Sequence, residues 1–312
     1  MSTSTVTIMQ TTKGIIAVII VALFVVLGKC RNTEESSPDP HTSVTQPTPG
    51  PTISDPSQPT RDPHLALGNP SNATKDERNY DNFLIEHPQF ALSYNRSRGT
   101  ANWVAWHLSK AWRGNARRQN NFRFDAALPA SWFRATTNHY TGSGFDRGHM
   151  CPSDDRDGSE EDNSATFLMT NIVPQAPKNN QETWRLLEEY CRRLADEGYE
   201  MYIYSGVYGR GGTGSNGTAT TIANGQIVVP ARLWKVVVVL PVGTNDIARI
   251  NANTRIIAID TPNTQTVDEK PWGDYRVSVR DIERATGLNF FASLPQSLQN
   301  AIETKVDNGP TR

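Results

Sequence analysis

The sequence predicts an α+β fold in which a mostly antiparallel sheet is flanked by helices. Strand-like segments are grouped before and after the helical segments, without the steady strand and helix alternation that indicates a parallel sheet. With 312 residues, 37% of them hydrophobic, the chain has material for one large domain or two small ones. All seven Trp lie beyond residue 100, and we expect a single folded domain in that part of the chain.

An uninterrupted apolar run, GIIAVIIVALFVVLG, covers residues 14–28. It is shorter than the roughly 20 residues that a helix needs to span a bilayer, and it suits the apolar core of a secretory signal. We therefore expect residues 1–30 to be a signal peptide or a membrane anchor, and the protein to be secreted or periplasmic. Cys30 stands where a bacterial lipoprotein is lipidated, but Lys29 occupies a position that prefers a small residue. Signal cleavage, anchoring and lipidation remain alternatives.

Residues 31–75 are rich in Pro, Thr and Ser and show no apolar periodicity. Nine of the chain's 20 prolines lie between residues 33 and 74. Such a segment cannot bury enough apolar surface to offset the entropy of ordering, so we predict a disordered linker here. The folded domain is accordingly predicted over residues 76–312.

The first expected strand is NWVAWHLSKAW at residues 102–112, which is aromatic and β-branched and runs into a turn. Residues 164–175 place Phe167, Met169 and Asn171 on one face by alternation, which predicts a second strand. A Gly-rich segment at residues 209–217 lacks the ending of a phosphate-binding loop and is expected to connect a hairpin. Further strands are expected at residues 200–209, 226–230, 233–241 and 254–262, and a short amphipathic helix at residues 277–291.

Residues 179–198 predict an amphipathic helix, because four apolar residues recur at helical spacing and Gly198 supplies a stop. At 100° per residue, Asn180 and Glu188 lie about 80° apart around this helix, and Arg192 lies about 40° further on. All three side chains can therefore border one cleft. The apolar stripe consists of Trp184, Leu187, Cys191 and Leu194.

Charge is distributed unevenly although the net charge is only −1. Residues 96–150 contain nine Lys or Arg and two acidic residues, whereas residues 153–162 contain six acidic residues and one Arg. A basic face on a nearly neutral protein is typical of proteins that hold polyanions; scattered solvated arginines are the alternative. The acidic segment is expected to be a solvated turn.

Two cysteines of the predicted domain, Cys151 and Cys191, leave two alternatives open. They form a disulfide if the protein is exported and their positions allow it, or they are two small buried hydrophobic residues. The histidines outside the motif described next are expected to be ordinary structural residues: His41, His64, His87, His107 and His139.

Two motifs carry chemistry: SGFDRGHMCPSDD at residues 143–155 and FLMTNIVPQAPKNNQETWRLLEEYCR at residues 167–192. Together, at this spacing, they resemble the DNA/RNA non-specific endonucleases of the ββα-metal superfamily, which includes bacterial extracellular sugar-nonspecific nucleases and mitochondrial endonuclease G. The resemblance extends over most of residues 65–308. It implies a ββα-metal active-site motif within the α+β fold.

The resemblance also implies a role for each matching residue. His149, within DRGH, corresponds to the family's general base, Asn180 to its Mg²⁺-binding asparagine, and Glu188 to the acid that holds metal-bound water. The other matching positions are Arg118, beside which Arg117 is the alternative, the helix residue Arg192, and the supporting residue Asn171.

These residue types suit the hydrolysis of a phosphodiester. A neutral histidine can take a proton from water near pH 7, Mg²⁺ can stabilise the departing oxygen, and arginines offer forked donors to phosphate. Nearby Mg²⁺ and arginines favour the neutral form of His149, so we expect activity to persist at alkaline pH. Mn²⁺ is expected to substitute for Mg²⁺, because both prefer oxygen ligands.

The resemblance thus implies an exported Mg²⁺-dependent endonuclease that cleaves single- and double-stranded DNA and RNA and leaves 5′-phosphates. Contacts with phosphates rather than base edges predict sequence-independent, salt-sensitive binding. A dedicated inhibitor protein is a further expected partner, and membrane contact is expected only through residues 1–30. The alternatives are a surface nucleic-acid-binding or uptake protein that has lost catalysis, and a phosphodiesterase acting on small phosphate esters.

Overall fold

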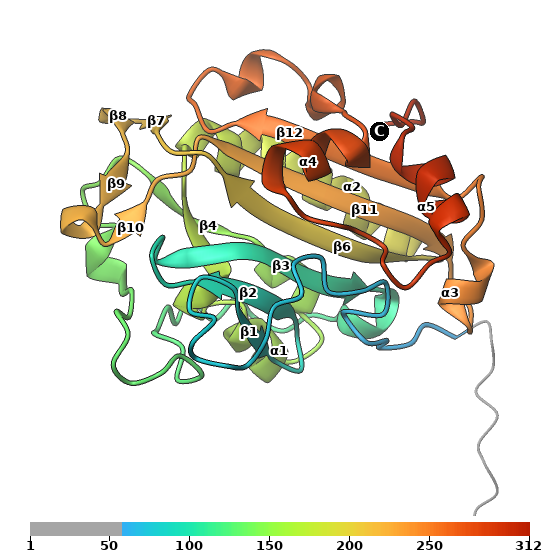
Figure 1. The fold of residues 1–312 in the computed structure, drawn as a ribbon, viewed down its shortest axis with the longest axis horizontal. Helices are drawn as coiled ribbons and strands as arrows, with labels where there is room; N and C mark the ends of the chain where they lie inside the picture. Colours follow the sequence, from blue (N-terminus) through green and yellow to red (C-terminus); the bar gives the residue numbers. More distant parts are fainter. Residues whose placement is uncertain (1–57) are drawn as a thin grey trace, which may run out of the picture. The chain divides into compact units, whose positions relative to one another are not determined.

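A six-stranded antiparallel sheet forms the centre of the computed structural model, which describes residues 58–312 (Figure 1). The strand order is β1-β2-β3-β6-β11-β12, and each pair of neighbours runs antiparallel. This arrangement confirms the predicted fold class. The strands are β1 (Phe83–Glu86), β2 (Ala91–Asn95), β3 (Thr100–Leu108), β6 (Tyr199–Tyr208), β11 (Arg232–Pro241) and β12 (Arg255–Pro262).

Both faces of the sheet are covered, and the alternation of side chains along each strand assigns them to two hydrophobic clusters. Met201 and Ile203 of β6 pack with α2 (Arg185–Asp196) on one face. Tyr202 and Tyr204 pack on the other face with α4 (Val279–Thr286) and α5 (Gln296–Glu303). Figure 1 shows α2 behind the central strands and α4 in front of them. The two faces are therefore separate environments.

The predicted helix at residues 179–198 is confirmed, with a π-helical turn over Asn179–Trp184 that continues into α2. All four residues of its apolar stripe are buried. Gly198, with a φ of 92°, follows the helix in a conformation that favours glycine. The other helices are α1 (Glu160–Ala165) and α3 (Asp246–Arg249). Short 3₁₀ turns lie at Lys110–Trp112, Thr137–His139, Ser153–Arg156, Met169–Asn171, Ala223–Gly225, Val267–Glu269 and Trp272–Tyr275.

A two-stranded ribbon precedes this helix: β4 (Asp146–His149) pairs antiparallel with β5 (Ile172–Gln175). The predicted strand at residues 164–175 is wrong for its first part, because only its last four residues are extended. The Asn171 side chain bonds backbone groups of Cys151 and Thr166, and this local bonding replaces a strand ladder. Two strands followed by a helix nevertheless form the ββα unit that the motifs predict.

The predicted boundary between linker and domain at residue 75 is too late in the chain. Leu67 and Ala73 are buried, and Leu84 donates a backbone hydrogen bond to Thr74 (2.8 Å). The end of the expected linker thus forms part of the folded unit, because its few apolar residues find partners on the sheet. The predictions for residues 1–30, for Cys30 and for the first part of the linker lie outside the described residues.

Four short strands complete the fold. The Gly-rich segment forms the predicted hairpin from β7 (Gly212–Gly214) and β8 (Gly217–Ala219), and β9 (Thr221–Ile222) pairs with β10 (Ile227–Val228). Within residues 58–312, no helix has the length and apolar character that crossing a bilayer requires.

Candidate active site

A polar cavity of about 300 Å³ lies where β4, the turn after it and the start of α2 meet. It brings together five of the six predicted site residues and leaves out Asn171. The chain reaches this cavity from segments far apart in sequence, as expected for a site built on a sheet and a helix. The lining residues are Arg118, Arg147, His149, Pro152, Ser153, Asp154, Asn180, Gln181, Arg185, Glu188, Glu189 and Arg192.

His149 ends β4, with its ring held between two aromatic rings. The ring centroids of Phe122 and Phe167 lie 5.5 Å and 4.9 Å from that of His149. Burial, together with the positive charges of Arg118 and Arg147, lowers the pKa of His149 to about 3. Its Nε2 is buried and has no hydrogen-bond partner among the described residues. His149 is therefore a neutral imidazole with a free nitrogen beside a cavity.

Asn180 reaches the cavity from the π-helical turn that precedes α2. Its Nδ2 donates to Asp146 Oδ2 (2.8 Å), and Gln181 Nε2 donates to the same oxygen (2.8 Å). Among residues 58–312 no hydrogen bond engages the Asn180 Oδ1. A fixed amide with a free carbonyl oxygen suits a hard divalent cation such as Mg²⁺. Asp146, from the DRGH motif, thus fixes the local geometry of this amide.

Glu188 lines the cavity and belongs to one of two ion pairs at this place. Lys235 of β11, only 1% exposed, lies with its Nζ 3.0 Å from Glu188 Oε1. Arg192 Nη1 lies 3.2 Å from Asp155 Oδ1. Burial raises the pKa of the Glu188 carboxyl, and the charges of Lys235 and Arg192 oppose that shift. The network holds Glu188 at the edge of the cavity with only one of its oxygens engaged by Lys235.

The acidic segment at residues 153–162 is only in part the solvated turn that was expected: Asp154, Glu160 and Glu161 are exposed, but two other acidic residues are buried. Asp155 is buried and accepts a hydrogen bond from Trp106 Nε1 (2.9 Å). Asp162 is also buried and pairs with Arg61 (3.0 Å). Asp155 pairs with the mostly buried Arg192, and Asp162 pairs with the partly exposed Arg61, so part of the acidic run is structural.

Aromatic rings position two arginines at the cavity. The Arg118 guanidinium lies 5.0 Å from the centre of the Phe167 ring and donates to Ser153 Oγ. Arg147 lies 4.4 Å from the centre of the Phe122 ring. Arg118 lines the cavity and Arg117 does not, which favours Arg118 in the alternative left open by the sequence.

Asn171 acts at a distance from the cavity. Its Oδ1 accepts from the backbone N–H of Cys151 (2.9 Å), and its Nδ2 donates to the carbonyls of Cys151 (2.8 Å) and Thr166 (2.9 Å). It thus holds the chain that follows His149.

Cys151 and Cys191 are both free and buried, and burial raises the pKa of each thiol to about 12. Of the two alternatives for these cysteines, the structure has the buried thiols.

Sequence reasoning missed Lys235 and gave Arg147 no specific role. A signal for the first exists: it is a single charge within the apolar strand LWKVVVVLP, which implies a buried partner. Arg147 lies inside the DRGH motif itself, and the interpretation of that motif considered only its histidine.

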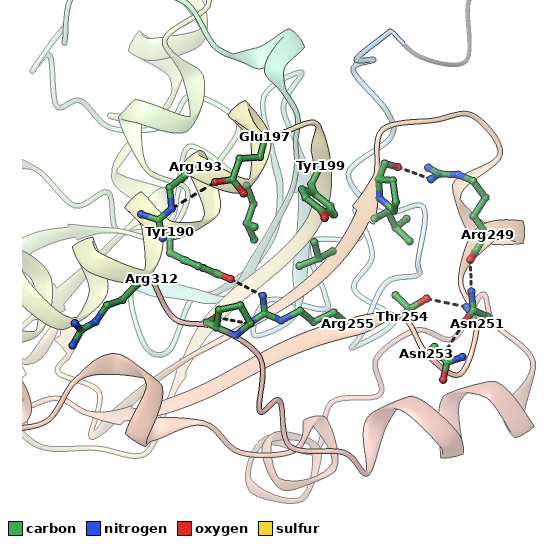
Figure 2. Close-up of a pocket in the computed structure, with 15 residues that line it drawn as sticks. Tyr190, Arg193, Glu197, Tyr199, Arg249, Asn251, Asn253, Thr254, Arg255 and Arg312 are labelled. Atoms are coloured by element: carbon green, nitrogen blue, oxygen red, sulfur yellow. Dashed lines mark hydrogen bonds and ion pairs between the residues drawn. The ribbon is translucent and has the colours of Figure 1, made fainter.

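A second cavity is larger, about 620 Å³, and lies beyond the end of α2 (Figure 2). Two of its arginines are occupied by neighbours: Arg255 bonds Asp307 (2.8 Å) and Arg193 lies 4.0 Å from Glu197. Figure 2 shows Arg255 also directed at the Tyr190 hydroxyl. None of the predicted site residues lines it. The smaller cavity is therefore the candidate active site.

Comparisons with known proteins agree with this assignment. A family model for DNA/RNA non-specific endonucleases matches residues 68–297. A nuclease from Nostoc sp. is 49% identical over 245 residues, covering 78% of this chain and 86% of that protein. Nuclease C1 from Cunninghamella echinulata var. echinulata is 34% identical over 223 residues, covering 69% and 84% respectively.

Among solved structures, the EndoG/EndoGI complex aligns with a TM-score of 0.61 and 23% identity, over 75% of this chain and 92% of that chain. At that identity the likeness carries the fold alone. The match of the family model to most of the described residues, with the relatives above, carries the family. This chain belongs to the DNA/RNA non-specific endonucleases.

Proposed function

We propose that this protein is an exported, Mg²⁺-dependent endonuclease that hydrolyses DNA and RNA with His149 as the general base and leaves 5′-phosphates. Membership of the family already makes it a nuclease of the phosphodiester-hydrolysing kind. The observation that carries the finer proposal is the convergence of a neutral imidazole, a fixed amide and a carboxylate on one open, arginine-lined cavity.

The roles follow from the surroundings of each side chain. His149 Nε2, free and unprotonated, would accept the proton of the attacking water. Asn180 Oδ1 would hold the cation, with Glu188 beside it. When bound, Mg²⁺ would supply charge stabilisation at the departing oxygen. Arg118 and Arg192 would bind the phosphate, and no base contact is needed for either.

The remaining parts of the proposal concern partners and location. The polar cavity is open, which suits a polymer better than a small phosphate ester. One solved structure that shares this fold is a complex of EndoG with EndoGI, and a nuclease without sequence preference endangers the cell that makes it. We therefore include an inhibitor protein among the partners. Export rests on residues 1–30, and any membrane contact would be confined to that segment.

The test uses closed-circular plasmid and single-stranded RNA as substrates, with Mg²⁺, with Mn²⁺ or with excess chelator. We expect both polymers to be cut with either metal ion and neither to be cut with chelator. Fragment ends should accept a kinase-transferred phosphate only after phosphatase treatment, as 5′-phosphates require.

Each part of the proposal can fail separately in this experiment. Undiminished cleavage in chelator would contradict the metal requirement. Direct labelling of untreated ends would contradict the proposed 5′-phosphate product. Tight binding of both polymers without cleavage would support the alternative of an inactive nucleic-acid-binding protein.

A further inference from the structure

A second cluster of metal-ligating side chains lies on the sheet face opposite α2. Asp62, His107, Glu200 and Asp246 each offer a ligand atom, and these atoms all lie within 4.8 Å of one another. They come from four segments: the chain before β1, β3, β6 and α3. We propose that this cluster is a structural site for a divalent transition-metal ion, with Zn²⁺ the preferred ion.

Strand register separates this cluster from the candidate active site. His107 pairs with Tyr202 across β3 and β6, and Glu200 lies two residues before Tyr202 on the same face. Tyr202 packs in the hydrophobic cluster that includes α4 and α5, whereas Leu108 and Met201 pack in the one that includes α2. The sheet itself therefore lies between His107 and the Lys235–Glu188 pair.

Two buried atoms of the cluster lack partners among the described residues: His107 Nε2 and Glu200 Oε2. Both side chains are fully buried, and the two atoms lie 3.6 Å apart. Asp62 Oδ2 lies 3.9 Å from the same nitrogen. An unsatisfied buried polar group destabilises a fold, and more strongly when it is charged. One cation between the three atoms would contact both unpartnered atoms and Asp62 Oδ2, which already accepts a hydrogen bond from Thr60 Oγ1.

The spacing and the charges suit such an ion. Ligand atoms around a tetrahedral Zn²⁺ at about 2.0–2.1 Å are separated by about 3.3–3.4 Å, so the pairs at 3.6 and 3.9 Å would contract slightly and the widest pairs, within 4.8 Å, would move further. Three carboxylates with the guanidinium of Arg249, which contacts Glu200 (2.5 Å) and Asp246 (2.6 Å), leave a formal charge of −2 when His107 is neutral. A divalent ion neutralises that charge, and an imidazole ligand favours zinc over magnesium or calcium.

One contact would have to give way. The backbone N–H of Asp62 donates to His107 Nδ1 over 3.3 Å, whereas an ion on Nε2 requires the proton on Nδ1. A single hydrogen bond of this kind contributes little to stability, whereas the binding of a structural Zn²⁺ ion supplies much of the folding free energy of small metal-binding domains. The ion therefore outweighs the contact. Asp62, whose side chain is 31% exposed, provides the route of entry, and coordination would fasten the chain before β1 to the sheet.

The test is Zn²⁺ retention by the 312-residue chain, stripped with chelator and then equilibrated with Zn²⁺ in excess Mg²⁺ to occupy oxygen-only sites. Retained metal is measured by elemental analysis and by thermal unfolding. We expect one Zn²⁺ per chain and a rise in Tm that saturates at one equivalent. Asn180→Ala should retain both effects, because Asn180 lies in the other site.

Two near-isosteric variants, Glu200→Gln and Asp62→Asn, should weaken Zn²⁺ binding by at least about tenfold. His87→Ala is the matched control, because His87 is another histidine paired with a buried carboxylate, Asp125 (2.8 Å), but outside the cluster. It should bind Zn²⁺ as the unaltered chain does. If Glu200→Gln does not fold, Zn²⁺ binding by Asp62→Asn, whose position is partly exposed, provides the test. No retained Zn²⁺, retention unchanged in the foldable ligand variants, or retention lost in Asn180→Ala would overturn the proposal.

Discussion

The two faces of the sheet each bury charge within a central strand, and they balance it differently. On the α2 face Lys235 is paired with Glu188 at 3.0 Å, so the protein supplies both charges itself. On the opposite face His107 Nε2 and Glu200 Oε2 face one another at 3.6 Å without a hydrogen bond. Glu200 Oε1 is paired with Arg249 (2.5 Å), so the described residues leave unsatisfied only the other carboxylate oxygen and the His107 nitrogen that faces it, and the proposed Zn²⁺ would contact both.

Access to solvent distinguishes the two faces further. The free groups on the α2 side, His149 Nε2 and Asn180 Oδ1, adjoin an open cavity. Those on the other side are closed in except near Asp62. Polar atoms without partners at an open cavity suit a substrate that binds and dissociates. Polar atoms without partners in a closed site suit a permanently bound ligand.

The largest expected effect separates the faces by activity. His149→Ala should lower the rate of plasmid cleavage by about 10²- to 10⁴-fold, because the general base is lost. Glu200→Gln, on the other face, should change that rate by less than about twofold, which is within the scatter of context effects on a distant site. Initial rates in Mg²⁺, with thermal melts to verify folding, provide the measurement. Equal losses in the two variants would mean that the faces are not independent.

The next effect concerns stability. Lys235→Met should destabilise the fold by about 3–5 kcal/mol, because it leaves Glu188 as a buried charge without its closest partner. Urea unfolding measures this loss, and the double variant Lys235→Met with Glu188→Gln should recover part of it. A loss in the double variant equal to the sum of the two single losses would show that the pair is not coupled.

Local sequence patterns predicted the parts of the fold and site that depend on local spacing. The helix at residues 179–198 followed from its apolar stripe, and this helix carries Asn180, Glu188 and Arg192 into one cavity. The resemblance added His149 and Arg118, which lie at the same cavity. These residues could be found because a helix places residues at fixed angles, and because short motifs keep their spacing.

The failures are side-chain effects that no periodicity carries. Asn171 lies in the part of the segment at residues 164–175 that is not extended, where its side-chain amide bonds the backbone in place of a strand ladder. His107 and Glu200 come close to one another only because two strands about 90 residues apart in the chain are neighbours in the sheet. Only the sheet register reveals that contact. His107 was expected to be an ordinary structural residue. Whether that holds is now the question that the Zn²⁺ experiment decides.

A smaller effect tests the electrostatics around His149. Burial, Arg118 and Arg147 lower its pKa, so the neutral base should be present from acidic pH upward and activity should persist through pH 7–9. Arg147→Gln removes one positive charge, which favours the imidazolium and raises the pKa of His149. The acidic limb of kcat/KM should therefore move to higher pH by about half a unit to one unit.

The control for this shift is Arg185→Gln, which removes a cavity arginine that is tied to Glu189 (2.6 Å) and is not among the charges acting on the His149 pKa. Its profile should keep the acidic limb of the unaltered chain. An acidic limb that moves to lower pH in Arg147→Gln, or moves equally in both variants, contradicts the assignment of His149 as the base.

The smallest effect asks whether polyanion binding belongs to one face. Each lost phosphate contact should reduce the slope of log K against log salt concentration by about 1. With His149→Ala as background to prevent cleavage, Arg118→Gln should show that reduction for single-stranded DNA between about 50 and 200 mM salt. Lys305→Gln, beyond α5 on the other face, should leave the slope unchanged. Because Lys305 is exposed and binds only the carbonyl of Ala252 among the described residues, it is as free to meet phosphate as any surface lysine. A slope reduced equally by both substitutions would mean that the nucleic acid is attracted by net surface charge, and that the cavity on the α2 face contributes chemistry without directing where the polymer binds.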